Sequence, residues 1–153
     1  MHEYVFYLSE FCRIKFDTMK LSFRKTAFWL CTVTGIGLLY IGIYFYVNPL
    51  QAGLNYGIHT STGSDYSFHY SKGIRDFAFG TIIQWYLFRK QFNALGWCLI
   101  FGSLIPMADV GIVLSHPDYS FHHLIAHLIA VIICLLCGIY YAKNHKICCS
   151  TSF

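Results

Sequence analysis

Long apolar stretches alternate with short polar ones along most of this chain. The last stretch continues without a charged residue over roughly 22 positions, enough to cross the apolar core of a bilayer as a helix. The four stretches cover residues 26–47, 73–88, 94–114 and 121–142. This pattern predicts an all-α fold, a bundle of four transmembrane helices connected up-down-up-down.

The second stretch is the shortest, at roughly 16 residues. It crosses a bilayer only if the basic side chains at its two ends extend toward the membrane surfaces. These side chains are Lys72 and Arg75 at the start, and Arg89 and Lys90 at the end. We retain it as a span because its loss would give the two halves of the chain conflicting orientations.

The composition agrees with a membrane environment. The 153 residues are 56% hydrophobic and 12% charged, with a mean hydropathy of +0.50, whereas a soluble domain carries about 25% charged residues. The length suits one membrane domain, residues 26–142. The net charge of +4 gathers near the ends of the apolar stretches, which indicates orientation in a lipid bilayer and not nucleic-acid binding.

Lysine and arginine are concentrated on one side of the predicted membrane. They lie in the N-terminal arm (residues 1–25), in the connection after the second stretch and in the tail (residues 143–153). Cytoplasmic segments carry such an excess, so both termini are predicted to be cytoplasmic, at the inner membrane if the source is bacterial. The arm mixes aromatic and basic residues, which favours an interfacial segment. Met19 is an alternative start to Met1.

The seven cysteines give no sign of a disulfide framework. All of them fall in predicted cytoplasmic arms or in the inner halves of predicted spans. Cys134 and Cys137 have the spacing of a redox motif, but inside an apolar helix this spacing favours two small packing residues.

A long polar connection and an internal proline interrupt the apolar pattern. Residues 50–71 form the longest connection, and His59 and His69 within it are predicted to be solvated. Pro106 interrupts the third stretch from within, because it removes a backbone donor and disturbs the preceding turn. Such breaks in membrane helices are tolerated beside cavities.

Ionisable side chains inside the predicted spans identify a candidate site, because such groups are costly in a membrane and mark function. Arg75 and Asp76 lie early in the second stretch, Asp109 lies late in the third, and His123 and His127 lie early in the fourth. Antiparallel spans bring these three places to one membrane face. The sequence therefore predicts one polar pocket at the non-cytoplasmic side.

Three interpretations of this pocket stay open. His123, His127 and Asp109 could ligate a divalent metal, although no metalloprotease helix motif accompanies them, and no cofactor is predicted. Asp109 and His123 could act as an acid–base pair on a lipophilic substrate. Alternatively, the polar groups only hold the helices together by hydrogen bonds. The chain has no nucleophile elbow, phosphate loop or dinucleotide fingerprint.

The residues at these positions resemble a family pattern. A Pro- and Gly-rich segment from Asn48 to Gly57 follows the first stretch, and the sequence Lys-Gly-Ile-Arg-Asp at 72–76 opens the second. Asp109 lies late in the third, and His123 (or His122) lies early in the fourth. This arrangement is similar to a small integral-membrane family described as domain of unknown function 4267, over about residues 26–142. The resemblance implies four membrane helices and no assigned activity.

The function predicted from the sequence is therefore coarse. We expect a multi-pass membrane protein that binds a small lipophilic ligand or a proton in the pocket of Arg75, Asp76, Asp109, His123 and His127. A membrane enzyme that uses the acid–base pair and a purely structural membrane subunit are the alternatives. A homo-oligomer is compatible with each of them.

Overall fold

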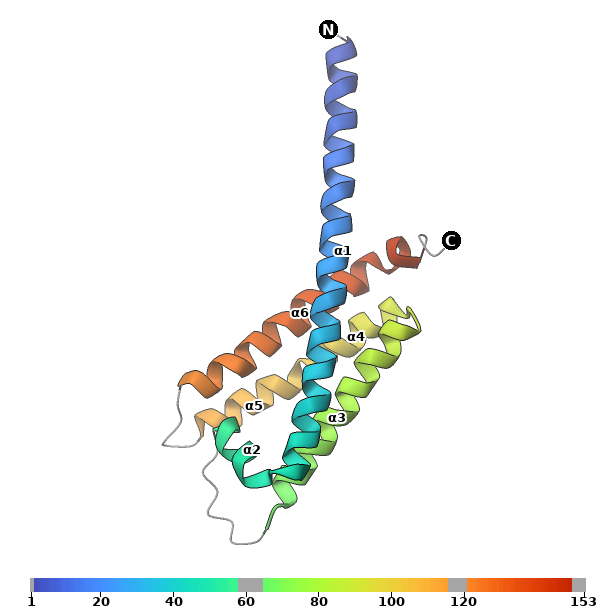
Figure 1. Cartoon of the computed structure of the whole chain (residues 1–153). Helices are drawn as coiled ribbons and strands as arrows, with labels where there is room; N and C mark the ends of the chain where they lie inside the picture. Colours follow the sequence, from blue (N-terminus) through green and yellow to red (C-terminus); the bar gives the residue numbers. More distant parts are fainter. Residues whose placement is uncertain (1, 58–64, 116–120, 150–153) are drawn as a thin grey trace.

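The chain folds into helices that run back and forth between two ends of a bundle (Figure 1). The computed structural model describes the backbone of residues 2–57, 65–115 and 121–149, and the side chains of 23–57, 65–115 and 121–143. Within these ranges the secondary structure is helical, with no strand. The helices are α1 (His2–Val47), α2 (Pro49–Tyr56), α3 (Ser67–Phe88), α4 (Phe92–Gly102), α5 (Leu104–Leu114) and α6 (Phe121–Cys149).

Among the described residues, three segments are long and apolar enough to cross a membrane. They are Phe23–Val47, Phe92–Leu114 and Phe121–Lys143, which correspond to the first, third and fourth predicted spans. The all-α prediction is thus confirmed, and the apolar helices are those of an integral membrane protein. α3, the second predicted span, is not among the three, so this span and the count of four stay predictions.

The N-terminal arm continues the first span as one helix. The backbone of α1 is helical from His2 to Val47 without a break near residue 25. Figure 1 shows its first half extending beyond the other helices. The division of the chain at residue 25, like that at residue 143, stays a prediction.

Helices occupy both ends of the connection predicted for residues 50–71. Pro49 occupies the first turn of α2, where its missing N–H costs nothing. Gly57 ends α2 with φ of 97°, a left-handed conformation that glycine adopts without strain. α3 then begins at Ser67 and not near residue 73, so it has 22 residues and a length of about 33 Å.

Glycines bring α1 and α3 into close contact. A Cβ at Gly42 would lie 2.8 Å from the Gly73 carbonyl oxygen, and one at Gly80 would lie 2.7 Å from the Gly35 carbonyl oxygen. Small residues allow membrane helices to approach until their backbones touch, which increases dispersion contact. The side chain of Gln84 adds a hydrogen bond of 2.8 Å to the carbonyl of Thr32.

A second glycine contact joins α4 to α6. A Cβ at Gly96 would lie 2.5 Å from the backbone nitrogen of Ala142, and one at Gly138 would lie 3.1 Å from the Gly96 carbonyl oxygen. The bundle is therefore built from two close pairs, α1 with α3 and α4 with α6. α5 packs on α6, and α1 meets α6 less extensively.

The third apolar stretch is divided, as Pro106 predicts. α4 ends at Gly102 and α5 begins at Leu104, with Ser103 between them. Pro106 has no N–H to donate to the carbonyl of Gly102, which breaks the hydrogen-bond ladder at this turn. In the turn between the two helices, the Ser103 hydroxyl donates to the carbonyl of Ile100 at 2.7 Å.

Two buried regions lie at opposite ends of the bundle. We call the first the packed end, where α1, α3, α4 and α6 bury the residues Ala27, Cys31, Ile83, Leu87, Leu95, Leu99, Cys134, Cys137 and Tyr141. The second, the charged end, surrounds Phe45, Ala52, Tyr56 and Val113 and holds the candidate site. Cys134 and Cys137 belong to the packed end, which agrees with their predicted packing role.

Candidate functional site

Four charged side chains from two helices meet at the charged end. Lys72 and Asp76 lie one turn apart on α3, and the Lys72 Nζ donates to Asp76 Oδ2 at 2.9 Å. The same nitrogen donates to Asp109 Oδ2 on α5, also at 2.9 Å. Lys72 thus connects two carboxylates that are far apart in the sequence.

Arg75 provides the second cation of the cluster. Its Nη2 donates to Asp109 Oδ1 at 2.8 Å and lies 3.2 Å from Oδ2, while its Nε lies 3.3 Å from Asp76 Oδ1. Each carboxylate is therefore paired with both cations. The two positive and two negative charges cancel, so the charge cluster of Lys72, Arg75, Asp76 and Asp109 is neutral as a whole.

Burial explains why the pairing is complete. Lys72, Asp76 and Asp109 are 6%, 4% and 4% exposed, and an unpaired charge at such sites would cost several kcal/mol, of the order of 3–5. Lys72 Nζ also lies 4.4 Å from the ring centroid of Tyr56 and 5.5 Å from that of Phe45. These cation–π contacts stabilise a desolvated ammonium group.

Lys72 is the residue that sequence reasoning missed. It was expected to extend toward the membrane surface, and the structure instead places it inside the bundle between two carboxylates. The signal that could have found it is the four-residue spacing from Lys72 to Asp76, which puts both side chains on one helix face. Arg75 is half-buried and fits the predicted pocket.

The structure separates the two predicted histidines. His127 Nδ1 lies 3.9 Å from Asp109 Oδ2, and its ring meets that of Tyr56 edge-on at 4.9 Å. His123 packs against Gly57, where a Cβ would lie 2.9 Å from His123 Nδ1. This nitrogen is buried and finds no hydrogen-bond partner within the part of the chain that the structure describes. The histidine beside Asp109 is thus His127.

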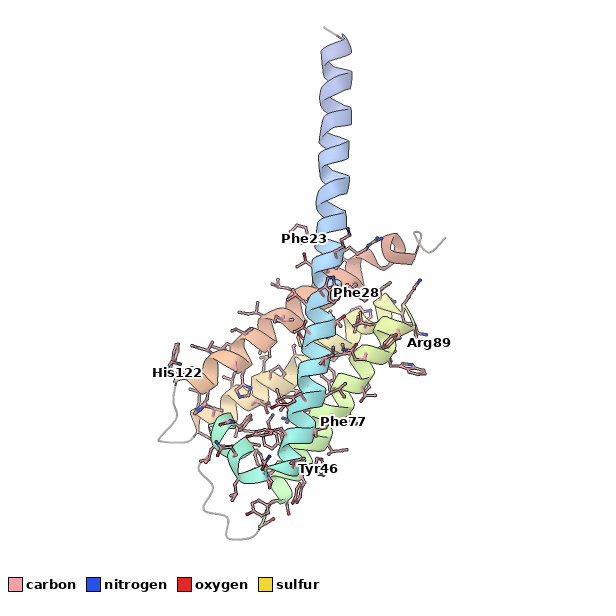
Figure 2. The ribbon with its side chains drawn as sticks, in the orientation of Figure 1. Phe23, Phe28, Tyr46, Phe77, Arg89 and His122 are labelled. Carbon is pink, nitrogen blue, oxygen red and sulfur yellow. The ribbon has the colours of Figure 1, made fainter. Side chains whose placement is uncertain are left out.

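Two other histidines bear on the prediction. His69 was expected to be solvated, but it lies in the first turn of α3, is 1% exposed and touches the rings of Phe45, Tyr66 and Phe68. The error arose because the helix starts earlier than the apolar pattern indicated. Figure 2 shows His122 directed away from the other helices, which leaves His123 as the pocket residue of that pair. His59 lies outside the described residues.

A cavity of about 400 Å³ adjoins the charge cluster. Asp76, Asp109, His123 and His127 line it, together with Lys72, so four of the five predicted pocket residues share one space. Most of the remaining wall is apolar and comes from α1, α3, α5 and α6, including Leu38, Phe79, Ile105 and Ala130. The cavity therefore has a polar end and an apolar body, as small-molecule sites commonly do.

Tyr56 forms part of the polar end from α2. Burial raises the pKa of its hydroxyl, and the nearby Asp109 carboxylate raises it further. Both effects raise the pKa, because burial and a neighbouring negative charge each disfavour the phenolate. Tyr56 therefore contributes a neutral hydroxyl to the cavity.

The arrangement of ligands offers little to a metal ion. Within 23–57, 65–115 and 121–143, no group of three or more His, Cys, Asp or Glu side chains is placed to hold one. Both oxygens of Asp109 already accept hydrogen bonds from Lys72 and Arg75. The chemistry that the site offers is hydrogen bonding beside a neutral ion cluster.

Comparison with known proteins gives a family and no activity. No curated protein and no solved structure matches the chain. The model of one family, described as a domain of unknown function (DUF4267), matches residues 35–141. This range contains the charge cluster, both pocket histidines and every lining residue of the cavity except Thr34. The match confirms the resemblance drawn from the sequence motifs. The chain belongs to the DUF4267 family.

Proposed function

We propose that this protein is a four-pass membrane protein that binds a small molecule in the cavity at its charged end. The observation that carries the proposal is the position of a buried, fully paired charge cluster on the wall of a cavity of about 400 Å³. Buried charges in membrane helices are retained where they line a functional cavity. Proton uptake at the same groups is the minor form of this proposal.

The contacts of α3 support a fourth pass. Its most buried charges, Lys72 and Asp76, are paired inside the bundle and do not face lipid. Most of its outward side chains are apolar, including Ile74, Ile82 and Trp85 at 53%, 42% and 60% exposed. Its length of about 33 Å is sufficient for a bilayer core of about 30 Å.

The proposed orientation follows from the basic residues. With four passes, the N-terminal arm, the turn at Arg89 and Lys90, and the tail lie on the same side, which the positive-inside rule assigns to the cytoplasm. The charge cluster then lies toward the opposite side. Figure 1 shows α2 at the end of the bundle away from the chain termini, as this topology requires.

Epitope tags test the topology in intact cells or sealed vesicles. Tags placed before Met1, in the turn at Lys90 and after Phe153 should all be protected from external protease. A tag inserted within residues 58–64 should be cleaved. Cleavage of both the tag within residues 58–64 and the tag at Lys90 would place the two ends of α3 on one side of the membrane and would refute four passes.

We favour binding over acid–base catalysis at this site. A catalytic carboxylate must exchange a proton with its partner, but Asp109 is held by Lys72 and Arg75. His127 at 3.9 Å is too far for a direct hydrogen bond to Asp109. In the binding proposal, the two cations hold the carboxylates, and His123 and His127 face the ligand.

Mass spectrometry of molecules extracted from the purified protein tests binding. Ala130→Phe should fill the cavity, because Ala130 lines it, and should abolish recovery of the bound molecule. Ile132→Phe is the matched control, since Ile132 lies on the same helix and is 55% exposed. Equal recovery from the wild type and both variants, each per folded protein, would contradict the proposal.

A further inference from the structure

The cavity reaches the outer surface of the bundle between α1 and α6. Tyr40 and Ile41 of α1 line the cavity and are nevertheless 67% and 40% exposed. Ala126 of α6, another lining residue, is exposed as well. Both helices belong to segments apolar enough to cross a membrane. A molecule dissolved in the bilayer can therefore reach the cavity sideways, without passing through water.

The charge cluster restricts the polar group that the cavity accepts. Its two cations and two carboxylates are mutually paired, with contacts between 2.8 and 3.3 Å. An ionic head group would have to displace one of these pairs and leave a buried charge without a partner, which is strongly unfavourable. The cluster therefore disfavours both anions and cations.

The polar groups that remain stand outside the charge cluster. His123 Nδ1 is buried and has no hydrogen-bond partner among the described residues. Tyr56 retains its proton, because burial and the Asp109 carboxylate raise its pKa. His127 lies beside Tyr56 at 4.9 Å between ring centroids. A single hydroxyl or carbonyl group could exchange hydrogen bonds with this set and leave the cluster intact.

We propose that the cavity takes an uncharged lipid with one hydroxyl or carbonyl group, which enters from the bilayer between α1 and α6. This inference rests on the binding function proposed above and adds the chemical class and the route. The head group lies against His123, His127 and Tyr56. The hydrocarbon lies along Leu38, Phe79, Ile105 and Ala130.

Photoaffinity labelling with matched probes tests the class. Three hexadecyl probes, each with a diazirine on the chain, differ only in the head group: an alcohol, a sulfonate and a trimethylammonium. The protein is embedded in phosphatidylcholine vesicles, and labelled peptides are identified by mass spectrometry. The alcohol should label α1 and α6 near Ile41 and Ala130, and unlabelled hexadecanol should compete.

Two variants locate the labelling and one tests the charge argument. Ala130→Phe should reduce labelling by the alcohol about tenfold, whereas Ile132→Phe should leave it unchanged. Ala126→Phe serves as a second filling variant if Ala130→Phe folds poorly. Asp109→Asn leaves the cluster with one uncompensated positive charge, so labelling should shift toward the sulfonate.

The outcomes separate the two proposals. Labelling that depends on residue 130 but is strongest in the wild type with the sulfonate or the trimethylammonium probe would overturn the head-group inference and keep the binding function. Labelling by all three probes that neither filling variant reduces would overturn both. Preference for the alcohol with loss in the filling variants supports both.

Discussion

The two ends of the bundle solve the problem of burial in different ways. The packed end buries apolar side chains and cysteines, and its helices α4 and α6 touch through Gly96 and Gly138. The charged end buries Lys72, Asp76 and Asp109 and encloses a cavity of about 400 Å³. Helices α1, α3 and α6 extend through both ends, whereas α4 lies at the packed end and α2 and α5 lie at the charged end (Figure 1).

This difference suits the two ends to different roles: the packed end to stability and the charged end to function. Close packing without cavities stabilises a membrane bundle by dispersion contacts. A cavity beside paired charges contributes less packing and requires every charge to keep its partner. The charged end is therefore the part of the fold that packing alone does not explain.

The largest expected effect is the loss of a carboxylate at the charged end. Asp109→Ala removes a partner of both Lys72 and Arg75 and should lower the free energy of unfolding by about 3–5 kcal/mol. Unfolding in a detergent–denaturant titration measures this loss of stability.

The double variant Lys72→Met with Asp109→Leu should be about 2 kcal/mol more stable than the sum of the effects of the corresponding single variants predicts. Additive effects would contradict a coupled cluster.

The next largest effect is expected at the glycine contact of the packed end. Gly96→Leu forces a side chain against the backbone of Ala142 and should cost about 3 kcal/mol, because a backbone cannot move aside as a side chain can. Gly111→Leu is the matched control, since nothing lies within 4 Å of a Cβ there. Similar melting temperatures for the two variants would show that α4 and α6 do not pack closely.

A medium effect should distinguish the two ends directly. Ala27→Leu adds bulk to the packed end and should cost about 1–3 kcal/mol. Ala130→Leu makes the same change beside the cavity and should cost less than about 0.5 kcal/mol in detergent without added lipid. The comparison uses unfolding of both variants under one condition, and equal costs would argue against an open cavity.

The smallest effect concerns the start of α3, outside the buried regions. Asp65 Oδ1 accepts hydrogen bonds from the Ser67 backbone nitrogen at 2.9 Å and the Ser67 hydroxyl at 2.5 Å, and these lower the pKa of the carboxyl. The stabilisation is complete above the unfolded pKa of about 3.9 and is lost as pH falls through the folded value. The small difference in melting temperature between the wild type and Asp65→Asn should therefore vanish on acidification. If the difference persisted at low pH, the ionised carboxylate would not be its cause.

The sequence predicted the fold class because apolar length and polar interruptions are local properties. The stretches at 26–47, 94–114 and 121–142 and the break caused by Pro106 follow from hydropathy and from the missing backbone donor of proline. The start of α3 was placed too late, because Ser67, His69 and Lys72 are polar and therefore resemble a loop in the sequence. In the structure, His69 and Lys72 are buried in the bundle.

The site could be predicted only to the level of a shared layer. Antiparallel connection was enough to bring Asp76, Asp109 and His127 to one end of the bundle. Which histidine meets Asp109, and that Lys72 points inward, depend on helix rotation and on α2, which periodicity does not determine. Side-chain pairing across helices depends on how the helices pack. The sequence pattern predicts only pairs within one helix, such as Lys72 with Asp76, from their spacing.

A crystal structure of the protein purified from its own membrane would test the central claim most directly. We predict elongated density in the cavity, with its polar end near His123 and His127, and Lys72 and Arg75 still paired with Asp109. A cavity closed by movement of α1 toward α6, with the four charges apart or facing solvent, would contradict the account.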